Sequence, residues 1–303
     1  MNNTYAPIIL FVYKRPEHTA KTLNSLGECF GIEESEMFVF ADGPKNLQDE
    51  TDVTETRRIV REFDKCKAIH IIESGVNKGL ANSVISGVTE VIEQYGRAIV
   101  VEDDLVLAPD FLTYMNQALD YYESDQRIWS ITGYSFNINF PKDYTSDMYL
   151  SYRASSWGWA TWKDRWDKVD WDVLDYPEFK TNKKLRNKFN RGGRDLSSML
   201  DAQMQGKIDS WAIRWCYAQS KNNALTVYPR ISRIQNIGFD GSGSHCGITS
   251  KYNTIISYGT ERVIFEPLDL DSRIDKAFRD QFGTAYDYMI IGLKTIIKRL
   301  LGI

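Results

Sequence analysis

Cysteine is scarce in this sequence, and its spacing excludes a cysteine-based metal centre. The four cysteines are Cys29, Cys66, Cys216 and Cys246, and no two of them form a CxxC pair. Zinc sites and disulfide frameworks place cysteines at short, regular spacings. We therefore expect reduced thiols, which favours a reducing, cytoplasmic compartment.

Long apolar runs and an excess of positive charge are also missing. The apolar run at residues 7–13 has the length of a strand, and no basic segment precedes it. A membrane-spanning helix needs about 20 apolar residues, and a signal peptide begins with a basic region. We expect neither one at this end of the chain. The net charge of -4 gives no drive toward nucleic acid, because proteins that bind nucleic acid are usually basic.

Two glycine-rich nucleotide-binding motifs are absent as well. No GxGxxG follows the first expected strand, and GxxxxGK does not occur. Neither a dinucleotide-binding fold nor a P-loop is therefore supported. A ligand that carries phosphate would need cationic side chains or a metal ion instead.

The composition that is present suits a large globular protein. Of the 303 residues, 43% are hydrophobic and 26% are charged. Short apolar runs alternate with segments of helical periodicity in the first third, which is typical of βα units. This pattern predicts an α/β fold. We expect strands at residues 7–13, 37–41, 68–73 and 98–101, and helices at residues 16–26, 51–63 and 80–95.

Three carboxylates follow the last of these strands. Glu102, Asp103 and Asp104 stand at the carboxyl end of the apolar run at residues 98–101. Ligands of open α/β sheets bind at that edge, and adjacent carboxylates repel one another unless a cation or hydrogen-bond donors compensate them. Mn²⁺ or Mg²⁺ prefers such oxygen ligands and keeps positions that a diphosphate can fill. The alternative is a polar turn before the helix that Pro109 begins.

Other strand ends carry polar side chains too. Arg15 follows the first expected strand, Asp42 follows the second, and Asn77 and Lys78 follow the third. Because the carboxyl ends of parallel strands meet at one edge of a sheet, these residues predict a crevice of nucleotide size. The alternatives are an ordinary Asp-Gly-Pro turn at Asp42 and a solvated surface cation at Arg15.

Four segments together resemble the GT-A nucleotide-sugar glycosyltransferases. They are RAIVVEDDLVLAPDFL at residues 97–112, PIILFVYKRPEHTAKTLNSL at 7–26, SSWGWATW at 155–162 and PRISRIQNIG at 229–238. The chain is most similar to the N-acetylglucosaminyltransferase I family and to bacterial family 2 glycosyltransferases of surface polysaccharide synthesis. The resemblance implies a Rossmann-like mixed sheet flanked by helices.

The same resemblance implies roles for the residues at the strand ends. Asp104 would ligate the metal ion, and Glu102 and Asp103 would contact the donor sugar and its ribose. Asp42 would read the edge of a uracil base, and Arg15 would bind the phosphate side of the donor.

The second half of the chain has the residues expected of an acceptor site. Trp159, Trp162 and Trp166 have the spacing of one buried helix face, so we assign them to the core. Trp157 and Gly158 lie in the loop before that expected helix. They are the candidates for contact with an acceptor sugar, because sugar faces stack on indole rings.

A general base is the next requirement, since inverting transfer needs a carboxylate near the acceptor hydroxyl. Asp209 is our candidate. The resembled family has Asp-Asp-Trp where this chain has Asp-Ser-Trp at residues 209–211. The alternative is that Asp209 or Ser210 caps the helix that follows.

Two further segments lie toward the end of the chain. The glycine-rich run at residues 241–247 has the composition of a lid loop, and its His245 is a candidate metal or phosphate ligand unless it is simply exposed. Residues 286–303 predict a C-terminal amphipathic helix that is basic and too short to span a bilayer. Such a helix lies on a membrane surface, or docks on the core or on a second subunit.

The sequence and the resemblance together predict a function and a domain division. We expect a glycosyltransferase domain at residues 1–265, with a nucleotide-sugar half at 1–105 and an acceptor half at 106–265, and a helical tail at 266–303. The resemblance implies an inverting, metal-dependent glycosyltransferase that moves a sugar, first of all GlcNAc from UDP-GlcNAc, to a glycan or lipid-linked glycan. Mn²⁺ or Mg²⁺ is the expected cofactor. Bacterial surface polysaccharide is the expected product, made in the cytoplasm at the inner face of the plasma membrane.

Three alternatives stay open at this point. They are a nucleotidyltransferase that acts on sugar phosphates, a glycoside hydrolase that uses two facing carboxylates, and a glycan-binding protein without catalytic activity.

Overall fold

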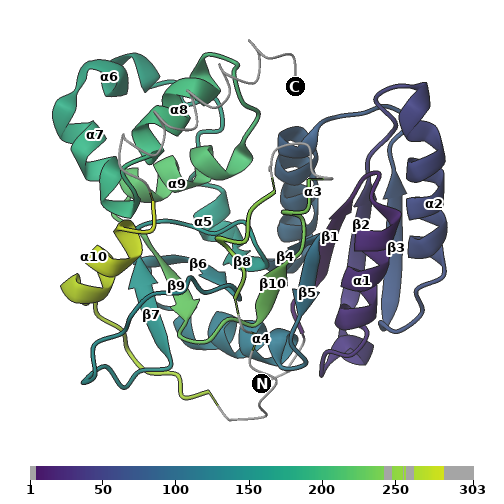
Figure 1. The fold of residues 1–303 in the computed structure, drawn as a ribbon, viewed down its shortest axis with the longest axis horizontal. Helices are drawn as coiled ribbons and strands as arrows, with labels where there is room; N and C mark the ends of the chain where they lie inside the picture. The colour runs from purple at the N-terminus through teal and green to yellow at the C-terminus, as the bar shows by residue number, and fades with distance from the viewer. Residues whose placement is uncertain (1–4, 242–247, 255, 257–262, 283–303) are drawn as a thin grey trace.

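A computed structural model describes residues 5–241, 248–254, 256 and 263–282 of the chain. Its centre is an eight-stranded sheet in the order β3-β2-β1-β4-β8-β6-β9-β7 (Figure 1). These strands are β1 (Ile8–Val12), β2 (Glu36–Ala41), β3 (Ala68–Glu73), β4 (Arg97–Glu102), β6 (Ile128–Thr132), β7 (Met148–Ser151), β8 (Trp159–Trp162) and β9 (Leu225–Pro229). A second, antiparallel pair consists of β5 (Leu105–Leu107) and β10 (Ile234–Asn236).

Helices cover both faces of the large sheet (Figure 1). They are α1 (Pro16–Leu26), α2 (Glu50–Arg61), α3 (Leu80–Tyr95), α4 (Phe111–Tyr122), α5 (Lys163–Trp166), α6 (Tyr176–Thr181), α7 (Lys183–Phe189), α8 (Leu196–Met204), α9 (Trp211–Lys221) and α10 (Ser272–Arg279). Short 3₁₀ turns lie at η1 (Ile32–Glu34), η2 (Leu47–Asp49) and η3 (Asn190–Gly192). No helix within the described ranges has the length and the apolar character needed to cross a bilayer.

The first half of the sheet is parallel, as the sequence predicts. β1 pairs in parallel with both β2 and β4, and β2 pairs in parallel with β3. β1 is apolar and buried at every position, which suits a strand covered on both faces. Leu10 and Leu23 of α1 belong to one hydrophobic cluster, whereas Ile9 and Val88 of α3 belong to the cluster on the other face. The prediction of a mixed α/β sheet flanked by helices is confirmed.

The second half of the sheet mixes strand directions. β8 is antiparallel to β4 and β6, and β9 is parallel to β6 and antiparallel to β7. Figure 1 shows α6, α7, α8 and α9 gathered beyond one end of this half.

The tryptophan run corrects one prediction. Trp159 and Trp162 lie on strand β8 and Trp166 ends α5, so the single helix expected from their spacing is wrong. All three side chains are nonetheless buried. In a strand, residues three positions apart point to opposite faces. Trp159 and Trp162 accordingly join hydrophobic clusters on different faces, and burial of both faces reproduces the apolar spacing of a helix.

The described part of the chain end contains one helix, α10. α10 packs Ile274 and Phe278 against Tyr149 and Tyr228 of the β7–β9 pair. The amphipathic helix expected at residues 286–303 lies outside the described residues. The domain division at residue 266 stays a prediction.

A buried ion pair ties the mixed half of the sheet to the helices beyond it. The Arg153 guanidinium, two residues after β7, donates to both carboxylate oxygens of Asp195 at 2.8 and 2.9 Å. The same guanidinium lies 3.8 Å from the ring centre of Phe282. Asp195 is buried directly before α8. The pair therefore joins three segments that are far apart in sequence.

We expect Asp195→Ala to destabilise the fold strongly. The substitution leaves the Arg153 guanidinium largely buried without its counter-ion, a change that typically costs about 3–5 kcal/mol of unfolding free energy. Urea denaturation followed by tryptophan fluorescence measures the loss.

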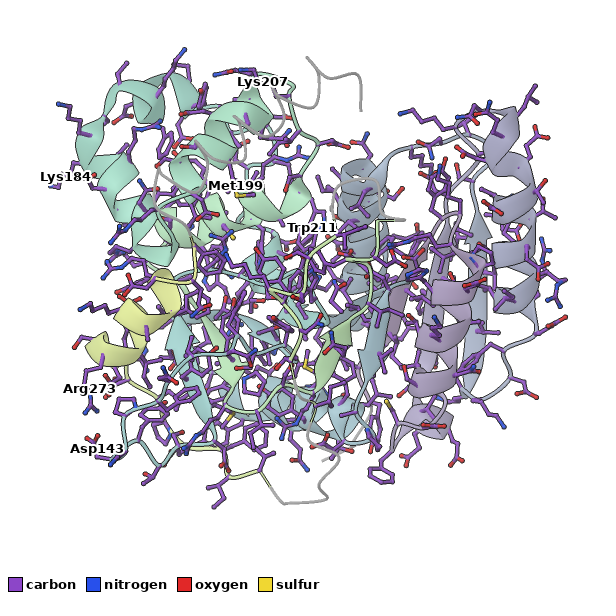
Figure 2. The ribbon with its side chains drawn as sticks, viewed as in Figure 1. Asp143, Lys184, Met199, Lys207, Trp211 and Arg273 are labelled. Carbon is purple, nitrogen blue, oxygen red and sulfur yellow. The ribbon has the colours of Figure 1, made fainter. Side chains whose placement is uncertain are left out.

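Asp143→Ala is the matched control for that measurement. Asp143 and Arg273 pair at 2.9 Å at the edge of the molecule (Figure 2), and the Asp143 side chain is 71% exposed. Exposed pairs contribute little to stability, so this variant should unfold like the wild type. If Asp195→Ala and Asp143→Ala lost the same unfolding free energy, the buried Arg153–Asp195 pair would not be a special contributor to stability.

Candidate functional site

The carboxyl ends of β1, β2 and β4 meet at one edge of the sheet. In the observed register Phe11 lies beside Glu102, and Val12 lies beside Ala41. Glu102 is the last residue of β4, Asp103 and Asp104 come directly after it, Arg15 follows β1 and Asp42 follows β2. The structure brings Arg15 against Asp103 and Asp104, and it brings Asp42 against the Lys78 backbone.

Glu102, Asp103 and Asp104, here called the acidic centre, are partly compensated by one arginine. The Arg15 guanidinium pairs with Asp103 Oδ1 and lies 3.0 Å from Asp104 Oδ2. The Tyr13 backbone N–H donates to Asp103 Oδ2 at 3.4 Å. Asp103 and Asp104 are both buried. Arg15 is thus no solvated surface cation, because its guanidinium pairs with two carboxylates.

The turn that carries the acidic centre is clamped from two sides. Thr22 of α1 donates its hydroxyl to the Asp103 carbonyl at 2.8 Å and accepts from the Leu105 N–H at 3.1 Å. On the other side, the Ile237 N–H donates to the Asp104 carbonyl at 2.8 Å. The second contact arises because β5 pairs with β10. The acidic centre is therefore held rigidly between α1 and the segment that follows β10.

Burial and mutual repulsion raise the pKa values of two of these acids, Glu102 and Asp103. Burial, with the charges of Asp104 and Asp103, raises the pKa of Glu102 to about 8 from 4.5, and Arg15 opposes this only in part. Burial also raises the pKa of Asp103 against the opposing effect of Arg15. In turn, Asp103 and Asp104 outweigh the effect of burial and raise the pKa of Arg15. One guanidinium is too little positive charge for three carboxylates.

The residues of this centre fit a divalent cation in their chemistry. Asp104 Oδ1 is buried and has no hydrogen-bond partner among the described residues. A carboxylate oxygen in that state is the kind of ligand that Mg²⁺ or Mn²⁺ prefers. Within the described ranges no three His, Cys, Asp or Glu side chains converge as a metal cluster. The protein would therefore supply few ligands and leave the others to the substrate. The other predicted ligand, His245, lies outside the described residues.

Asp42 holds a turn together. Its carboxylate accepts from the backbone N–H groups of Gly43 at 2.9 Å, Lys78 at 2.8 Å and Gly79 at 3.1 Å. These bonds join the end of β2 to the turn at the start of α3. These backbone donors use most of the hydrogen-bonding capacity of the Asp42 carboxylate. A base edge that binds to Asp42, as predicted, would have to share the carboxylate with them.

Asn77 and Lys78 belong to the same turn. The Asn77 amide donates to the Gly43 carbonyl at 2.9 Å, and the Lys78 side chain is exposed. Arg57 of α2, which the sequence analysis missed, donates to the carbonyls of Asp42 at 3.2 Å and Ser74 at 2.7 Å. Its carbonyl partners lie 15 and 17 residues away, so no local pattern could have identified it.

Asp209 lies beside this turn from the other half of the chain. Ser210, and not Asp209, caps α9 by accepting from the Ile213 N–H at 3.3 Å. The Asp209 side chain is 53% exposed and lies 3.9 Å from Arg214. A Cβ placed on Gly79 would be 3.3 Å from Asp209 Oδ2. Trp211, which begins α9, is buried and is labelled near the centre of Figure 2.

The two predicted acceptor residues have different surroundings. Trp157 is partly exposed and contacts the rings of Tyr134 and Phe239, with centroids 4.5 and 5.5 Å away. Gly158 is buried with a positive φ of 54°, and a Cβ there would lie 2.1 Å from Ile234 Cδ1. Gly158 therefore allows close packing against β10, whereas Trp157 offers a ring edge or face to a ligand.

The shifted carboxyl gives a prediction about pH. Because the pKa of Glu102 is about 8 when folded against an ordinary 4.5, the folded protein holds a proton that the unfolded chain has lost between these values. Stability should therefore fall as pH rises through this window, by up to about 1.4 kcal/mol per pH unit. Glu102→Gln removes the titration. Differential scanning calorimetry should find this variant more stable than the wild type at pH 8.5 and equal to it at pH 5.

Glu90→Gln, an exposed position in α3, is the control for the amide substitution. It should match the wild type at both pH values. A stability gain of Glu102→Gln that is the same at pH 5 and at pH 8.5 would show that Glu102 does not titrate in this window.

Comparison with known proteins finds similarities that include part of this site. Residues 88–197 match the model of the GNT-I family. A stretch of 103 residues is 33% identical to an alpha-1,3-mannosyl-glycoprotein 2-beta-N-acetylglucosaminyltransferase from Arabidopsis thaliana. That match covers 31% of this chain, and this chain spans only 22% of the length of the plant protein.

A solved structure is also similar. The crystal structure of S. aureus TarS superposes with a TM-score of 0.44 and 12% identity, over 75% of this chain and 36% of that chain.

The family match includes the acidic centre and Trp157 but ends before Asp209, and it begins after Arg15 and Asp42. Over residues 88–197, the predicted resemblance of this chain to the N-acetylglucosaminyltransferase I family is confirmed.

Proposed function

We propose that this chain is an inverting, metal-dependent glycosyltransferase that uses a nucleotide-sugar donor. One observation carries the proposal. The under-compensated acidic centre lies at the carboxyl ends of parallel strands, and it falls inside the segment that matches the GNT-I family. Such an edge is where open α/β sheets bind ligands. The first candidate for the donor is UDP-GlcNAc, because the plant relative is named as an N-acetylglucosaminyltransferase.

The donor would lie across the strand ends. Asp104 would hold Mn²⁺ or Mg²⁺, and a bound divalent ion would supply positive charge for the departing diphosphate. Arg15 already lies against Asp104 and would contribute a second, fixed positive charge. Glu102 and Asp103 would contact the donor sugar and ribose. Asp42, Asn77 and Lys78 would surround the base and ribose.

Asp209 is the proposed general base. Its carboxylate is exposed, is not used as a helix cap and lies beside Gly79 at the edge of the proposed donor site. It would accept the proton of the acceptor hydroxyl while that oxygen forms its bond to the anomeric carbon and the nucleotide diphosphate leaves from the opposite face. The configuration at the anomeric carbon is inverted by this single displacement.

The acceptor would approach from the side of Trp157. Trp157 is partly exposed and contacts Phe239, which follows the Gly238 that lies against Asp104. Such an indole suits the apolar face of a sugar ring. A growing glycan, either a bacterial surface polysaccharide or a lipid-linked oligosaccharide, is the acceptor class that we propose. We also propose that the protein acts in the cytoplasm at the inner face of the membrane. Residues 286–303 would contact the membrane surface or form a dimer.

We expect UDP to stabilise the protein only in the presence of Mn²⁺. At a hundredfold excess over the dissociation constant, a ligand stabilises the folded state by about 2.7 kcal/mol. Asp104→Asn should abolish the Mn²⁺-dependent part, because it removes the charged oxygen that would bind the ion. A thermal-shift titration with UDP, UDP-GlcNAc and other nucleotide sugars measures both effects.

Asp269→Asn, with a side chain that is 98% exposed, is the control and should respond like the wild type. Stabilisation by UTP and a sugar phosphate, but not by UDP-sugars, would favour a nucleotidyltransferase. No response to any nucleotide would remove the glycosyltransferase proposal.

Asp209→Asn should lower kcat by about 100-fold or more and change the affinity for the donor by less than about twofold. General-base catalysis typically contributes about 10²–10⁴ to the rate, and the donor does not depend on this carboxylate. Release of UDP from the donor sugar, measured with acceptor, gives kcat.

Ser210→Ala is the matched neighbour. It removes the cap of α9, which typically costs about 1 kcal/mol of stability, and it should leave kcat unchanged. If Ser210→Ala lowered kcat as much as Asp209→Asn, the effect would belong to the helix start and not to a base.

A further inference from the structure

A short backbone segment lies directly against the acidic centre. In the segment of residues 237–240, after β10, the Ile237 N–H donates to the Asp104 carbonyl at 2.8 Å. Gly238 comes so close that an added Cβ would lie 2.1 Å from Asp104 Oδ2 and 3.1 Å from the Arg15 guanidinium. The position of this segment therefore limits how Asp104 and Arg15 can turn.

Side chains from two sides of the site hold the end of this segment. Phe239 packs on the rings of Trp157 and Tyr252, with centroids 5.5 and 4.9 Å away. On the opposite side, His18 Nε2 lies 3.1 Å from Asp240 Oδ2. β10 ends at Asn236, so strand pairing no longer fixes these residues.

His18 is well placed to act on the acidic centre through this contact. It lies in the first turn of α1, three residues after Arg15, and is 8% exposed. The same helix supplies Thr22, whose hydroxyl forms hydrogen bonds with the Asp103 carbonyl and the Leu105 N–H. One rigid helix thus connects Arg15, the turn of the acidic centre and the end of the segment at residues 237–240.

We propose that His18 is a positioning residue for the donor diphosphate. Its pairing with Asp240 fixes residues 237–240 against the acidic centre, and this keeps Arg15 and Asp104 in the orientation that receives the donor's phosphates. The inference rests on the proposed donor site, but the contact itself can be tested without any activity.

The first measurement is amide hydrogen exchange on the full chain. His18→Leu removes the contact of His18 with Asp240 and keeps an apolar side chain on α1. Exchange at the amides of residues 237–240 should rise about tenfold, while the amides of α1 stay protected, because opening is confined to the released segment. Unchanged exchange at residues 237–240 would overturn the proposal.

The second measurement is steady-state kinetics with the nucleotide sugar. His18→Leu should raise KM for the donor about tenfold and change kcat by less than about twofold, which corresponds to lost ground-state and transition-state binding alike. His18→Gln, whose amide nitrogen can also donate to Asp240, should restore KM to near the wild-type value. If His18 had a purely structural role, His18→Leu would lower stability without raising KM more than it changes kcat. His18→Gln would then not restore KM.

A second histidine provides the matched control. His70 lies on β3, is 47% exposed at its side chain and is 3.7 Å from Glu36. His70→Leu should leave both exchange at residues 237–240 and the donor KM unchanged. A donor KM that stays normal in His18→Leu despite faster exchange would also overturn the proposal.

The two readouts separate this inference from the proposed function. A wild type that turns over no nucleotide sugar would refute the glycosyltransferase proposal, and the exchange measurement would still decide whether His18 fixes the segment. In the double variant of His18→Leu and Asp240→Ala, exchange at residues 237–240 should be no faster than in Asp240→Ala alone. Additive effects of the two substitutions would contradict a direct pairing.

Discussion

The site depends on one guanidinium that compensates two buried carboxylates. Removing an ionised carboxylate from water costs several kcal/mol even after the protein relaxes. Arg15 can offset that cost for Asp103 and Asp104 because β1 and β4 are neighbours in the sheet. The hydrogen bonds of Thr22 and the absence of a side chain at Gly238 both let the backbone lie close to the buried acids. Burial, together with the charge of Asp104 and Asp103, raises the pKa of Glu102. The negative charge that Arg15 leaves uncompensated is the electrostatic reason for a bound cation.

The topology explains why these groups meet where they do. From β1 the chain moves to β2 and β3 on one side and then returns to β4 on the other side, so the order of strands reverses between β1 and β4 (Figure 1). Open sheets form a ligand crevice at such a reversal. Arg15 and the acidic centre stand on its two sides. Beyond β4 the sheet becomes mixed, and this second half brings Asp209, at the start of α9, back against Gly79.

The sequence predicted what local patterns determine. The strands around residues 8–12 and 97–102, the helix that Pro16 begins and the acidic strand end all follow from periodicity and turn residues. The failures have a common cause in contacts between distant segments. Trp159 and Trp162 look helical because both faces of β8 are covered. The partners of Asp42, 36 and 37 residues away, and the pairing of His18 with Asp240 could not be read from spacing.

Arginine and a divalent cation need not compete for Asp104. The Arg15 guanidinium contacts Oδ2, and the glycine at position 238 lies on that same oxygen, so Oδ1 is the one left without a partner among the described residues. The Thr22 clamp belongs to a regular helix, whereas residues 237–240 follow the end of a three-residue strand. Backbone hydrogen bonds to Asp104 and Thr249 and the contacts of Phe239 and Asp240 hold that segment. These contacts keep Gly238 on Oδ2 beside the Arg15 guanidinium, so the orientation that leaves Oδ1 for an ion depends on both the helix and the segment after β10.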